Sequence, residues 1–312
     1  MKQPLVYIVI LNWNGYKDTS ELLESLYKIN YADFKIVVVD NSSSQGEAEK
    51  LKINYGDKVH IILCKENLGF SSGNNVGIKY SLGKNADYIL LLNNDTIVEP
   101  NFLDILVKKL ELENKVGIVA PRINYYDEPE KIWSEGGKIS PIRGSGFAYS
   151  DKLDGEVDIS DRFASFVSGC CMLIKKDVFI KVGFFDENYF LYTEDTDLCF
   201  RVKKNGFKIC VTPASKIYHK VSNSSKNGYS VLPLYYTTRN RLYFAKKNFP
   251  KIYFFTVLYI MSAMILKSIH WFLLGKSKNV IAIKNSFKDF FSGRMGKIND
   301  ENYFALRNNN SE

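Results

Sequence analysis

The chain has 312 residues, 46% of them apolar and 14% aromatic, which is enough for a large buried core and unlike a disordered protein. Five cysteines without a CxxC spacing argue against a zinc site or a disulfide framework and favour a reducing compartment. The formal net charge of +8 is unevenly spread, because residues 201–299 contain 19 Lys/Arg and one acidic residue, Asp289, whereas residues 1–200 contain 22 Lys/Arg and 30 Asp/Glu. The first strand pattern begins almost at the N-terminus, so we expect no signal peptide and a protein that starts in the cytoplasm.

Strand and helix patterns alternate over the first 120 residues. Apolar strand patterns lie at 6–11, 34–39, 58–64, 87–92 and 116–120, and helical spacing of apolar residues lies at 17–29, 73–83 and 100–113. This alternation predicts an α/β fold with a mostly parallel central sheet flanked by helices. A glycine-rich stretch, 121–168, is expected to form edge strands and loops over the sheet, after which a strand is predicted at 166–174 and a short helix at 177–182.

Polar or aromatic side chains stand just past the ends of three predicted strands: Asn12, Trp13, Asp40, Asn41, Asn93, Asn94 and Asp95. The carboxyl ends of parallel strands meet in the crevice where open α/β sheets bind ligands. Oxygen ligands suit Mg²⁺ or Mn²⁺, which usually also hold substrate phosphates. The pattern therefore predicts a nucleotide and metal site. Asx-turns and helix N-caps are the structural alternatives for the same residues.

A segment rich in glycine and asparagine, residues 69–77, has a pattern that suggests ligand binding. Gly69, Gly73 and Gly77 let the backbone approach a ligand or a helix closely, and Asn74 and Asn75 open a predicted helix whose N-terminus favours phosphate or ribose oxygens. The turn matches neither a P-loop nor the GxGxxG fingerprint.

An acidic cluster follows an aromatic run, Tyr189 to Tyr192. It contains Glu194, Asp195 and Asp197. A helix N-terminus enriched in acids would explain the cluster without chemistry, and Asp197 is spaced to pair with Arg201 at i+4.

Six segments in order resemble the inverting family 2 glycosyltransferases of the GT-A nucleotide-diphospho-sugar transferase fold, in particular the rhamnosyltransferase-like and galactofuranosyltransferase-like branch. The resemblance extends over about residues 4–245. It rests on residues 9–15 (VILNWNG), 38–43 (VVDNSS), 66–77 (ENLGFSSGNNVG), 92–96 (LNNDT) and 193–198 (TEDTDL), and on a lone downstream histidine, His219.

The resemblance implies a role for each part of the donor site. Asp40 would accept a hydrogen bond from the ring N–H of uracil or thymine, and Trp13 would stack on that base, with core packing as its alternative. Asp95 would bind the metal that bridges the donor diphosphate. The family commonly has Asp-x-Asp there, whereas Asn93 stands at the first position in this chain and removes one carboxylate. His219 matches a second ligand, with an ordinary surface or core histidine as the alternative.

The resemblance also implies the chemistry, a single displacement at an anomeric carbon with a nucleoside diphosphate as the leaving group. Asp195 would be the base that takes the proton of the acceptor hydroxyl, with Glu194 beside it on the acceptor side. We further expect Trp133 to line the acceptor pocket, where a loop anchor is equally compatible with the pattern. We expect Arg239 to reach the donor diphosphate or a lipid diphosphate. The alternative is that Arg239 lies on a solvent-exposed helix face and binds no ligand.

The basic C-terminal third holds fifteen residues without a charge, 252–266, followed by Lys267 and an aromatic segment containing His270. A membrane span needs ~20 mainly apolar residues, so this pattern favours a helix lying on an anionic membrane surface over a span, a buried helix pair or a nucleic-acid site. We predict a catalytic domain at 1–245, a basic, aromatic membrane-surface segment at 246–299 and a polar tail at 300–312.

The sequence therefore predicts a metal-dependent hexosyltransferase at the cytoplasmic face of the plasma membrane. It would move a hexose or deoxyhexose, by branch resemblance rhamnose, from a UDP- or dTDP-sugar to a growing, lipid-linked glycan. A nucleotidyltransferase acting on sugar phosphates is one alternative, although residues 12–16 lack the basic Gly-rich loop that such an enzyme needs. The other alternative is a non-catalytic protein that binds membranes.

Overall fold

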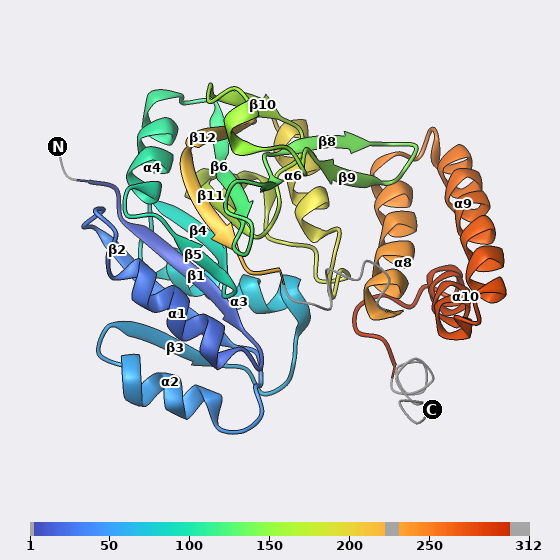
Figure 1. The fold of residues 1–312 in the computed structure, drawn as a ribbon, viewed down its shortest axis with the longest axis horizontal. Coiled ribbons are helices and arrows are strands. Elements are labelled where there is room, and N and C mark those ends of the chain that lie inside the picture. The colour runs from blue at the N-terminus through green and yellow to red at the C-terminus, as the bar shows by residue number, and fades with distance from the viewer. Residues whose placement is uncertain (1–2, 222–230, 300–312) are drawn as a thin grey trace.

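The computed structural model describes residues 3–221 and 231–299. Its centre is a ten-stranded sheet with helices on both faces (Figure 1). Along its main path the strand order is β10 (Arg162–Ala164), β12 (Lys208–His219), β6 (Val116–Tyr125), β11 (Cys171–Lys175), β4 (Tyr88–Asn93), β1 (Val6–Asn12), β2 (Phe34–Asp40) and β3 (Val59–Leu63). Two short strands lie off that path: β5 (Thr96–Val98) pairs with β12, and β7 (Ile132–Ser134) pairs with β6.

The sheet is mixed. Strands β4, β1, β2 and β3 pair in parallel, as the alternating strand and helix patterns predicted, and β6 pairs in parallel with β12. Strand β11 runs antiparallel to both β4 and β6, so it joins the two parallel groups. The carboxyl ends of β1, β2 and β4 meet at one edge of the sheet, where the predicted polar residues follow them.

Buried side chains alternate between the two faces of the sheet, which explains the nearly continuous apolar strands. Ile8 and Ile10 of β1 pack under α1 (Tyr16–Leu26) and α4 (Phe102–Leu112). Val9 belongs to the opposite layer, with α3 (Gly69–Gly83), α5 (Lys176–Val182) and α6 (Glu194–Lys204). Helix α2 (Glu47–Tyr55) lies beside β3.

Helix α3 begins at Gly69, one turn before the predicted start at residue 73. Gly69 has φ +78°, and a side chain there would collide with the carbonyl oxygen of Phe190. A Cβ at Gly73 would meet the side chain of Leu11, and one at Gly77 would meet Val9. These last two glycines therefore serve the close packing of α3 on the sheet.

Beyond the sheet stand three C-terminal helices, α8 (Val231–Asn248), α9 (Tyr253–Leu273) and α10 (Ser277–Phe291), which pack on one another. The predicted domain boundary at 245 falls inside α8. Aromatic contacts join α8 to the sheet domain: Tyr236 stacks on Phe190 at a centroid distance of 5.4 Å, and Phe244 packs edge-on against Phe200 at 5.9 Å. The predicted polar tail, 300–312, lies outside the described residues.

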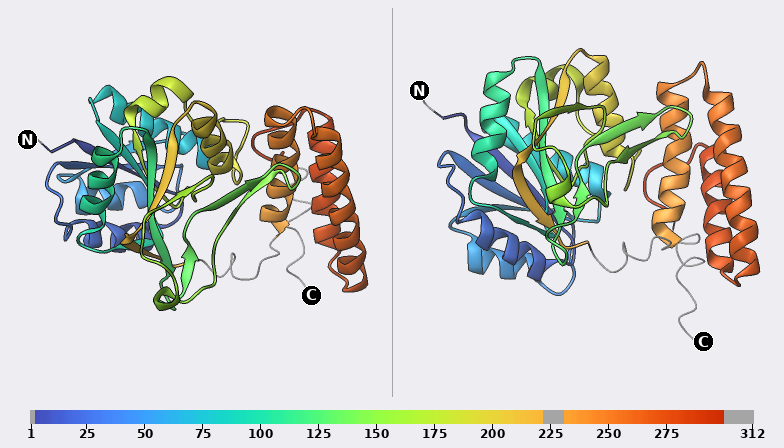
Figure 2. Two further views of the ribbon diagram at one scale, coloured as in Figure 1. Left: turned by 90° about the horizontal axis from the view of Figure 1, so that it is seen from above. Right: turned by 45° about the horizontal axis from the view of Figure 1, so that its top comes forward.

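A hairpin, β8 (Gly137–Ser140) and β9 (Ser145–Ala148), extends from the sheet domain to these helices (Figure 2). Thr256 of α9 donates to the carbonyl oxygen of Pro141 at 3.1 Å, and Arg241 of α8 donates to that of Arg143 at 2.8 Å. The glycine-rich middle of the sequence thus forms short strands that connect the two parts of the fold.

Candidate active site

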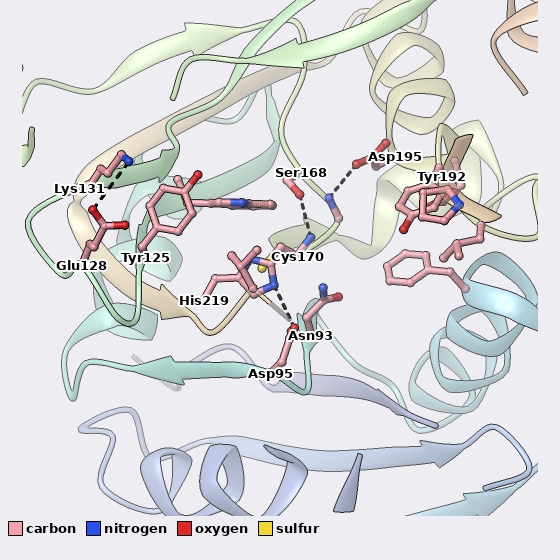
Figure 3. A pocket seen from close by; sticks show the side chains of 17 residues that line it. Asn93, Asp95, Tyr125, Glu128, Lys131, Ser168, Cys170, Tyr192, Asp195 and His219 are labelled. Atoms are coloured by element: carbon pink, nitrogen blue, oxygen red, sulfur yellow. Dashed lines mark hydrogen bonds and ion pairs between the residues drawn. The ribbon is translucent and has the colours of Figure 1, made fainter. Parts of the chain in front are cut away.

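A cavity of about 790 Å³ opens at the carboxyl end of β4. Six of the predicted site residues line it together: Asn93, Asp95, Trp133, Glu194, Asp195 and His219 (Figure 3). Positions separated by more than a hundred residues in sequence thereby face one space.

Strand pairing between β5 and β12 brings Asp95 and His219 together. Thr96, the residue after Asp95, lies opposite His219 in the antiparallel register. The backbone N–H of Lys220 donates to the carbonyl oxygen of Asp95 at 2.9 Å. As a result, Nε2 of His219 lies 3.2 Å from Oδ2 of Asp95. The indole of Trp133, on β7, packs edge-on against the imidazole of His219, with the ring centroids 4.4 Å apart, and this contact fixes the orientation of the imidazole.

The side chains of Asp95 and His219 are suited to bind a hard divalent cation that takes only a few of its ligands from the protein. Burial by itself would raise the pKa of Asp95, but the hydrogen bond with His219 helps to hold that pKa below its usual value. Oδ1 of Asp95 and Nδ1 of His219 are buried and have no hydrogen-bond partner within residues 3–221 and 231–299. The same residues contain no cluster of three or more His, Cys, Asp or Glu suited to a metal. A cation held here would take its other ligands from phosphate oxygens and water, as Mg²⁺ usually does.

The second acidic pair, Glu194 and Asp195, opens helix α6 on the other side of the cavity. It follows two consecutive non-glycine residues in the left-handed region, Tyr192 at φ 69° and Thr193 at φ 78°. Such conformations cost of order 1–3 kcal/mol each and persist only where surrounding contacts hold them. Oδ2 of Asp195 accepts from the backbone N–H of Gly169 at 3.1 Å, and Oδ1 accepts from that of Thr196 at 2.6 Å.

The two carboxyls differ in their electrostatic surroundings. Burial, and then repulsion from Asp195, raises the pKa of Glu194 well above its usual value, and Oε2 of Glu194 has no hydrogen-bond partner among the described residues. Burial also raises the pKa of Asp195, although hydrogen bonds from Gly169 and Thr196 oppose the rise. Glu194 therefore keeps a proton more readily, and Asp195 is the better candidate for an ionised carboxylate.

A second, largely apolar cavity of about 390 Å³ adjoins the first and shares Phe70 and Leu191 with it. Trp13, Asn41 and Gly69 line this cavity. The Trp13 side chain is 55% exposed, which argues against the core-packing alternative and leaves its ring free to stack on a ligand. The amide of Asn41 is held in place, because its oxygen accepts from the N–H of Leu68 and its nitrogen donates to the carbonyl oxygen of Gly69.

Three predicted donor-binding residues instead hold the loops around the crevice. Asp40 is 2% exposed and lines neither cavity; it accepts from the Asn12 amide at 2.8 Å and from the backbone N–H of Ser43 at 2.9 Å, which is the Asx-turn alternative. Asn12 is completely buried at the centre of this network. Asn94 donates to the hydroxyl of Thr19 at 3.1 Å and so ties the end of β4 to α1.

The predicted role of the Gly73–Asn75 segment at a helix N-terminus is corrected by the start of α3 at Gly69. Asn74 and Asn75 lie in the second turn and are buried. The Asn74 amide donates to the carbonyl oxygen of Phe70, whereas Asn75 exchanges two hydrogen bonds with the backbone of Phe185. Their amides therefore connect backbone segments, and neither residue lines either of the two cavities.

Arg239 is also corrected. The residue is 1% exposed and lines neither cavity. It lies over the rings of Tyr235 and Tyr236, at 5.1 and 5.2 Å from their centroids, and donates to the carbonyl oxygen of Gly296 at 2.6 Å. The residue fastens α8 to the segment after α10.

The prediction missed several residues that line the larger cavity, among them Tyr125, Lys131, Ser168 and Tyr192. Tyr125 is the last residue of β6, which continues five residues beyond its predicted end. In this longer strand the pairing of β6 with β12 contains a register irregularity. The aromatic pair Tyr125–Tyr126 was the available sequence signal for this part of the wall, whereas Lys131 gave none.

The chain is similar to known glycosyltransferases in both sequence and fold. The family model described as "Glycosyl transferase family 2" matches residues 7–183, more than half of the chain. An uncharacterized glycosyltransferase of Rickettsia prowazekii (strain Madrid E) is 34% identical over 199 residues, which are 64% of this chain; the chain spans only 58% of that relative's length. The rhamnosyltransferase WbbL of Escherichia coli (strain K12) is 28% identical over 256 residues, covering 78% of this chain and 94% of WbbL.

Among solved structures, the mannosyltransferase PcManGT from Pyrobaculum calidifontis, in complex with GDP-Man and Mn²⁺, superimposes with a TM-score of 0.58 at 12% identity. The superposition covers 94% of this chain and 89% of PcManGT, and it confirms the predicted fold. The family match confirms the predicted enzyme class: this chain belongs to glycosyl transferase family 2.

Proposed function

We propose that the protein transfers a hexose or deoxyhexose from a UDP- or dTDP-sugar, with inversion and with the help of a divalent metal, to a hydroxyl of a growing glycan. The observation that carries the proposal is the pairing, across one cavity, of Asp95 and His219 with Glu194 and Asp195. A cation site for a leaving diphosphate and a base for an attacking hydroxyl are the two groups that a single displacement at an anomeric carbon needs.

We place the donor across the two adjoining cavities. Its base would stack on Trp13 in the apolar cavity, and its diphosphate would extend past Gly69 toward Asp95 and His219. Mg²⁺ or Mn²⁺ held by these two side chains would neutralise charge that develops on the departing diphosphate. The Mn²⁺ in the PcManGT complex supports this assignment.

Asp195 serves as the base in this proposal. Its carboxylate is pre-positioned by the N–H groups of Gly169 and Thr196, and these hydrogen bonds oppose the rise that burial causes in the pKa of Asp195. Taking the proton from an acceptor hydroxyl as that oxygen attacks requires one such carboxylate, and the sugar is then inverted at its anomeric carbon. Trp133, Tyr125 and Tyr192 line the same cavity and suit the C–H faces of an acceptor sugar.

Rhamnose is the proposed sugar. The similarity to WbbL, which extends over nearly the whole of that rhamnosyltransferase, supports it. A donor panel that includes other dTDP- and UDP-sugars tests this choice.

We further propose a lipid-linked acceptor and a peripheral position at the cytoplasmic face of the plasma membrane, and the exposed surface of α9 supports the membrane contact. This 21-residue helix has a mean hydropathy of 1.4 and is long enough to cross a membrane, although one such helix is weak evidence for a span. It buries Ile260, Met264 and Trp271 against its neighbours. Its outer apolar surface remains exposed at Phe254, Phe255, Leu258, Tyr259, Met261, Ile265, Leu266, Ile269, Phe272 and Leu273.

An apolar surface of this kind marks an interaction site, and exposed lysines beside it favour an anionic partner. Lys267, Lys276, Lys284 and Lys288 are exposed on or next to α9 and α10. Basic residues around an aromatic, apolar helix favour an anionic lipid surface. Because α9 also packs along α8 and α10, we propose that it lies on the membrane and does not span it.

Incubation of the full chain with dTDP-rhamnose and other dTDP- or UDP-sugars, Mn²⁺ and membrane lipid extract tests the function. Release of nucleoside diphosphate together with an extended lipid-linked glycan is the expected result. Release of pyrophosphate from a sugar phosphate and a nucleoside triphosphate would instead assign a nucleotidyltransferase. Vesicle binding without turnover of any donor would assign a non-catalytic membrane protein.

A further inference from the structure

We propose that Asn240, on helix α8, is a positioning residue for the Glu194–Asp195 pair. This inference rests on the proposed role of Asp195 as the base. It assigns to the C-terminal helices a part in catalysis beyond contact with lipid.

The turn that presents the two carboxylates needs external support. Tyr192 and Thr193 both have positive φ, and neither is a glycine. Two such residues in succession hold their conformation only where neighbouring groups fix them. Helix α6 starts directly afterwards, so a relaxed turn would displace Glu194 and Asp195 together.

Asn240 supplies that support. Its side chain is completely buried, and its amide nitrogen donates to the carbonyl oxygens of Leu191 at 2.9 Å and Tyr192 at 2.8 Å. Nε of Arg239 donates to the amide oxygen of Asn240 at 3.3 Å, which directs the two N–H donors toward the turn. The nitrogen of a side-chain amide carries two N–H donors, so this one group satisfies both carbonyl oxygens.

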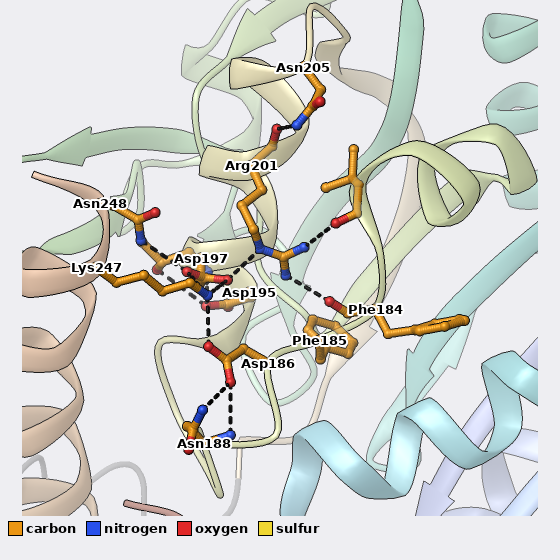
Figure 4. Close-up of polar contacts among 12 residues, drawn as sticks. Phe184, Phe185, Asp186, Asn188, Asp195, Asp197, Arg201, Asn205, Lys247 and Asn248 are labelled. Atoms are coloured by element: carbon orange, nitrogen blue, oxygen red, sulfur yellow. Dashed lines mark hydrogen bonds and ion pairs between the residues drawn. The ribbon is translucent and has the colours of Figure 1, made fainter. Parts of the chain in front are cut away.

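The C-terminal end of α8 stabilises the start of α6, directly after the same turn. Asp197, in the first turn of α6, is completely buried and accepts from Arg201 at 2.6 Å, the pairing its spacing predicted (Figure 4). It also accepts from Lys247 at 3.1 Å and from Asn248 at 3.0 Å. Asn240 and the Lys247–Asn248 end are two turns apart on α8, so one helix holds the strained turn and the start of α6.

The matched control is Thr238, on the same helix and 1% exposed. Its hydroxyl contacts the sulfur of Met264 on α9 at 3.6 Å and so faces away from the turn. Thr238→Val removes a buried polar group from α8 without touching residues 191–197. Asn240→Ser keeps one donor and gives an intermediate case.

The experiment combines steady-state kinetics, melting temperature and amide hydrogen exchange on the full-length variants, with all activities measured well below the lowest melting temperature. Asn240→Ala should lower kcat by about 100-fold, the size of effect expected when a reacting group moves by ~1 Å, and should change the donor KM far less. Asn240→Ser should retain more of kcat than Asn240→Ala, and Thr238→Val should resemble wild type. Exchange in the segment 189–199 should be faster in Asn240→Ala than in Thr238→Val.

Three results would overturn the proposal: a near wild-type kcat in Asn240→Ala, equal kcat losses in Asn240→Ala and Thr238→Val, or equal exchange in segment 189–199 of the two variants. The exchange measurement needs no substrate. It therefore tests the support of the turn even if the wild-type protein turns over none of the donors, a result that would count against the proposed function instead.

Discussion

Replacing Asp195 with asparagine keeps the size of the side chain and removes the ability to accept a proton. The structure predicts that folding survives. Asp195 accepts two backbone hydrogen bonds, from Gly169 and Thr196, and an asparagine oxygen can keep one of them. The other N–H would face an amide group, at a cost of about 1–3 kcal/mol. Loss of the negative charge beside buried Glu194 offsets part of that cost, so the melting temperature should fall by only a few degrees.

The rate should fall much more. General base catalysis contributes about 10²–10⁴-fold, equivalent to ~3–5.5 kcal/mol of transition-state stabilisation. Asp195 does not line the apolar cavity and does not touch Asp95, so binding of the nucleoside diphosphate with Mn²⁺ should be unchanged.

The assay pairs product release with titration calorimetry of UDP or dTDP in the presence of Mn²⁺. Glu194→Gln is the matched control, because it makes the same carboxyl-to-amide change at the other residue of the pair and leaves Asp195 in place. Its rate should fall less than that of Asp195→Asn. A transfer rate of Asp195→Asn within a few-fold of wild type would show that Asp195 is not the base. An equal loss of rate in both variants would refute the assignment of the base to Asp195 and not to Glu194.

Other predictions test the remaining parts of the account. Asp95→Ala should lose Mn²⁺-dependent binding of UDP or dTDP, and unchanged affinity by calorimetry would count against the metal role. A Leu266→Ser, Phe272→Ser double variant should pellet less with anionic liposomes than wild type or Ile53→Ser, an exposed control on α2; equal pelleting would exclude α9 as the docking surface. Because folding raises the pKa of Glu194 above 4.5, stability should fall as pH rises from about 4.5 through the raised value. Melting curves of Glu194→Gln should show a smaller fall over that range, and identical curves would contradict the burial argument.

The sequence was most informative where chemistry and secondary structure coincide. Apolar strands followed by Asn, Asp or Trp mark the carboxyl edge of the sheet, because buried strands are nearly all apolar and polar residues can appear only where they end. For that reason Asp95 and Trp13 could be placed beside the crevice from local patterns. The convergence of Asp95 with His219 was predicted only by resemblance, since it depends on pairing between β5 and β12, more than a hundred residues apart.

The predicted site differed from the structure where the same type of polar side chain can either bind a ligand or satisfy hydrogen bonds inside the fold. Asn74, Asn75 and Asn94 have the side chains of a ligand site, yet each satisfies backbone or side-chain groups inside the fold. Arg239 was assigned to a diphosphate because it is a guanidinium in a basic region, whereas aromatic rings and carbonyl oxygens surround it. Burial of such residues depends on tertiary contacts that periodicity does not reveal.

The most direct test of the central claim is a crystal structure of the protein with UDP or dTDP and Mn²⁺, with the ion located by its anomalous scattering. We predict one Mn²⁺ coordinated by Asp95, by His219 and by the diphosphate, with the base stacked on Trp13 and the β-phosphate facing the cavity that Asp195 lines. An ion bound away from Asp95, or a nucleotide bound outside these two cavities, would contradict the account.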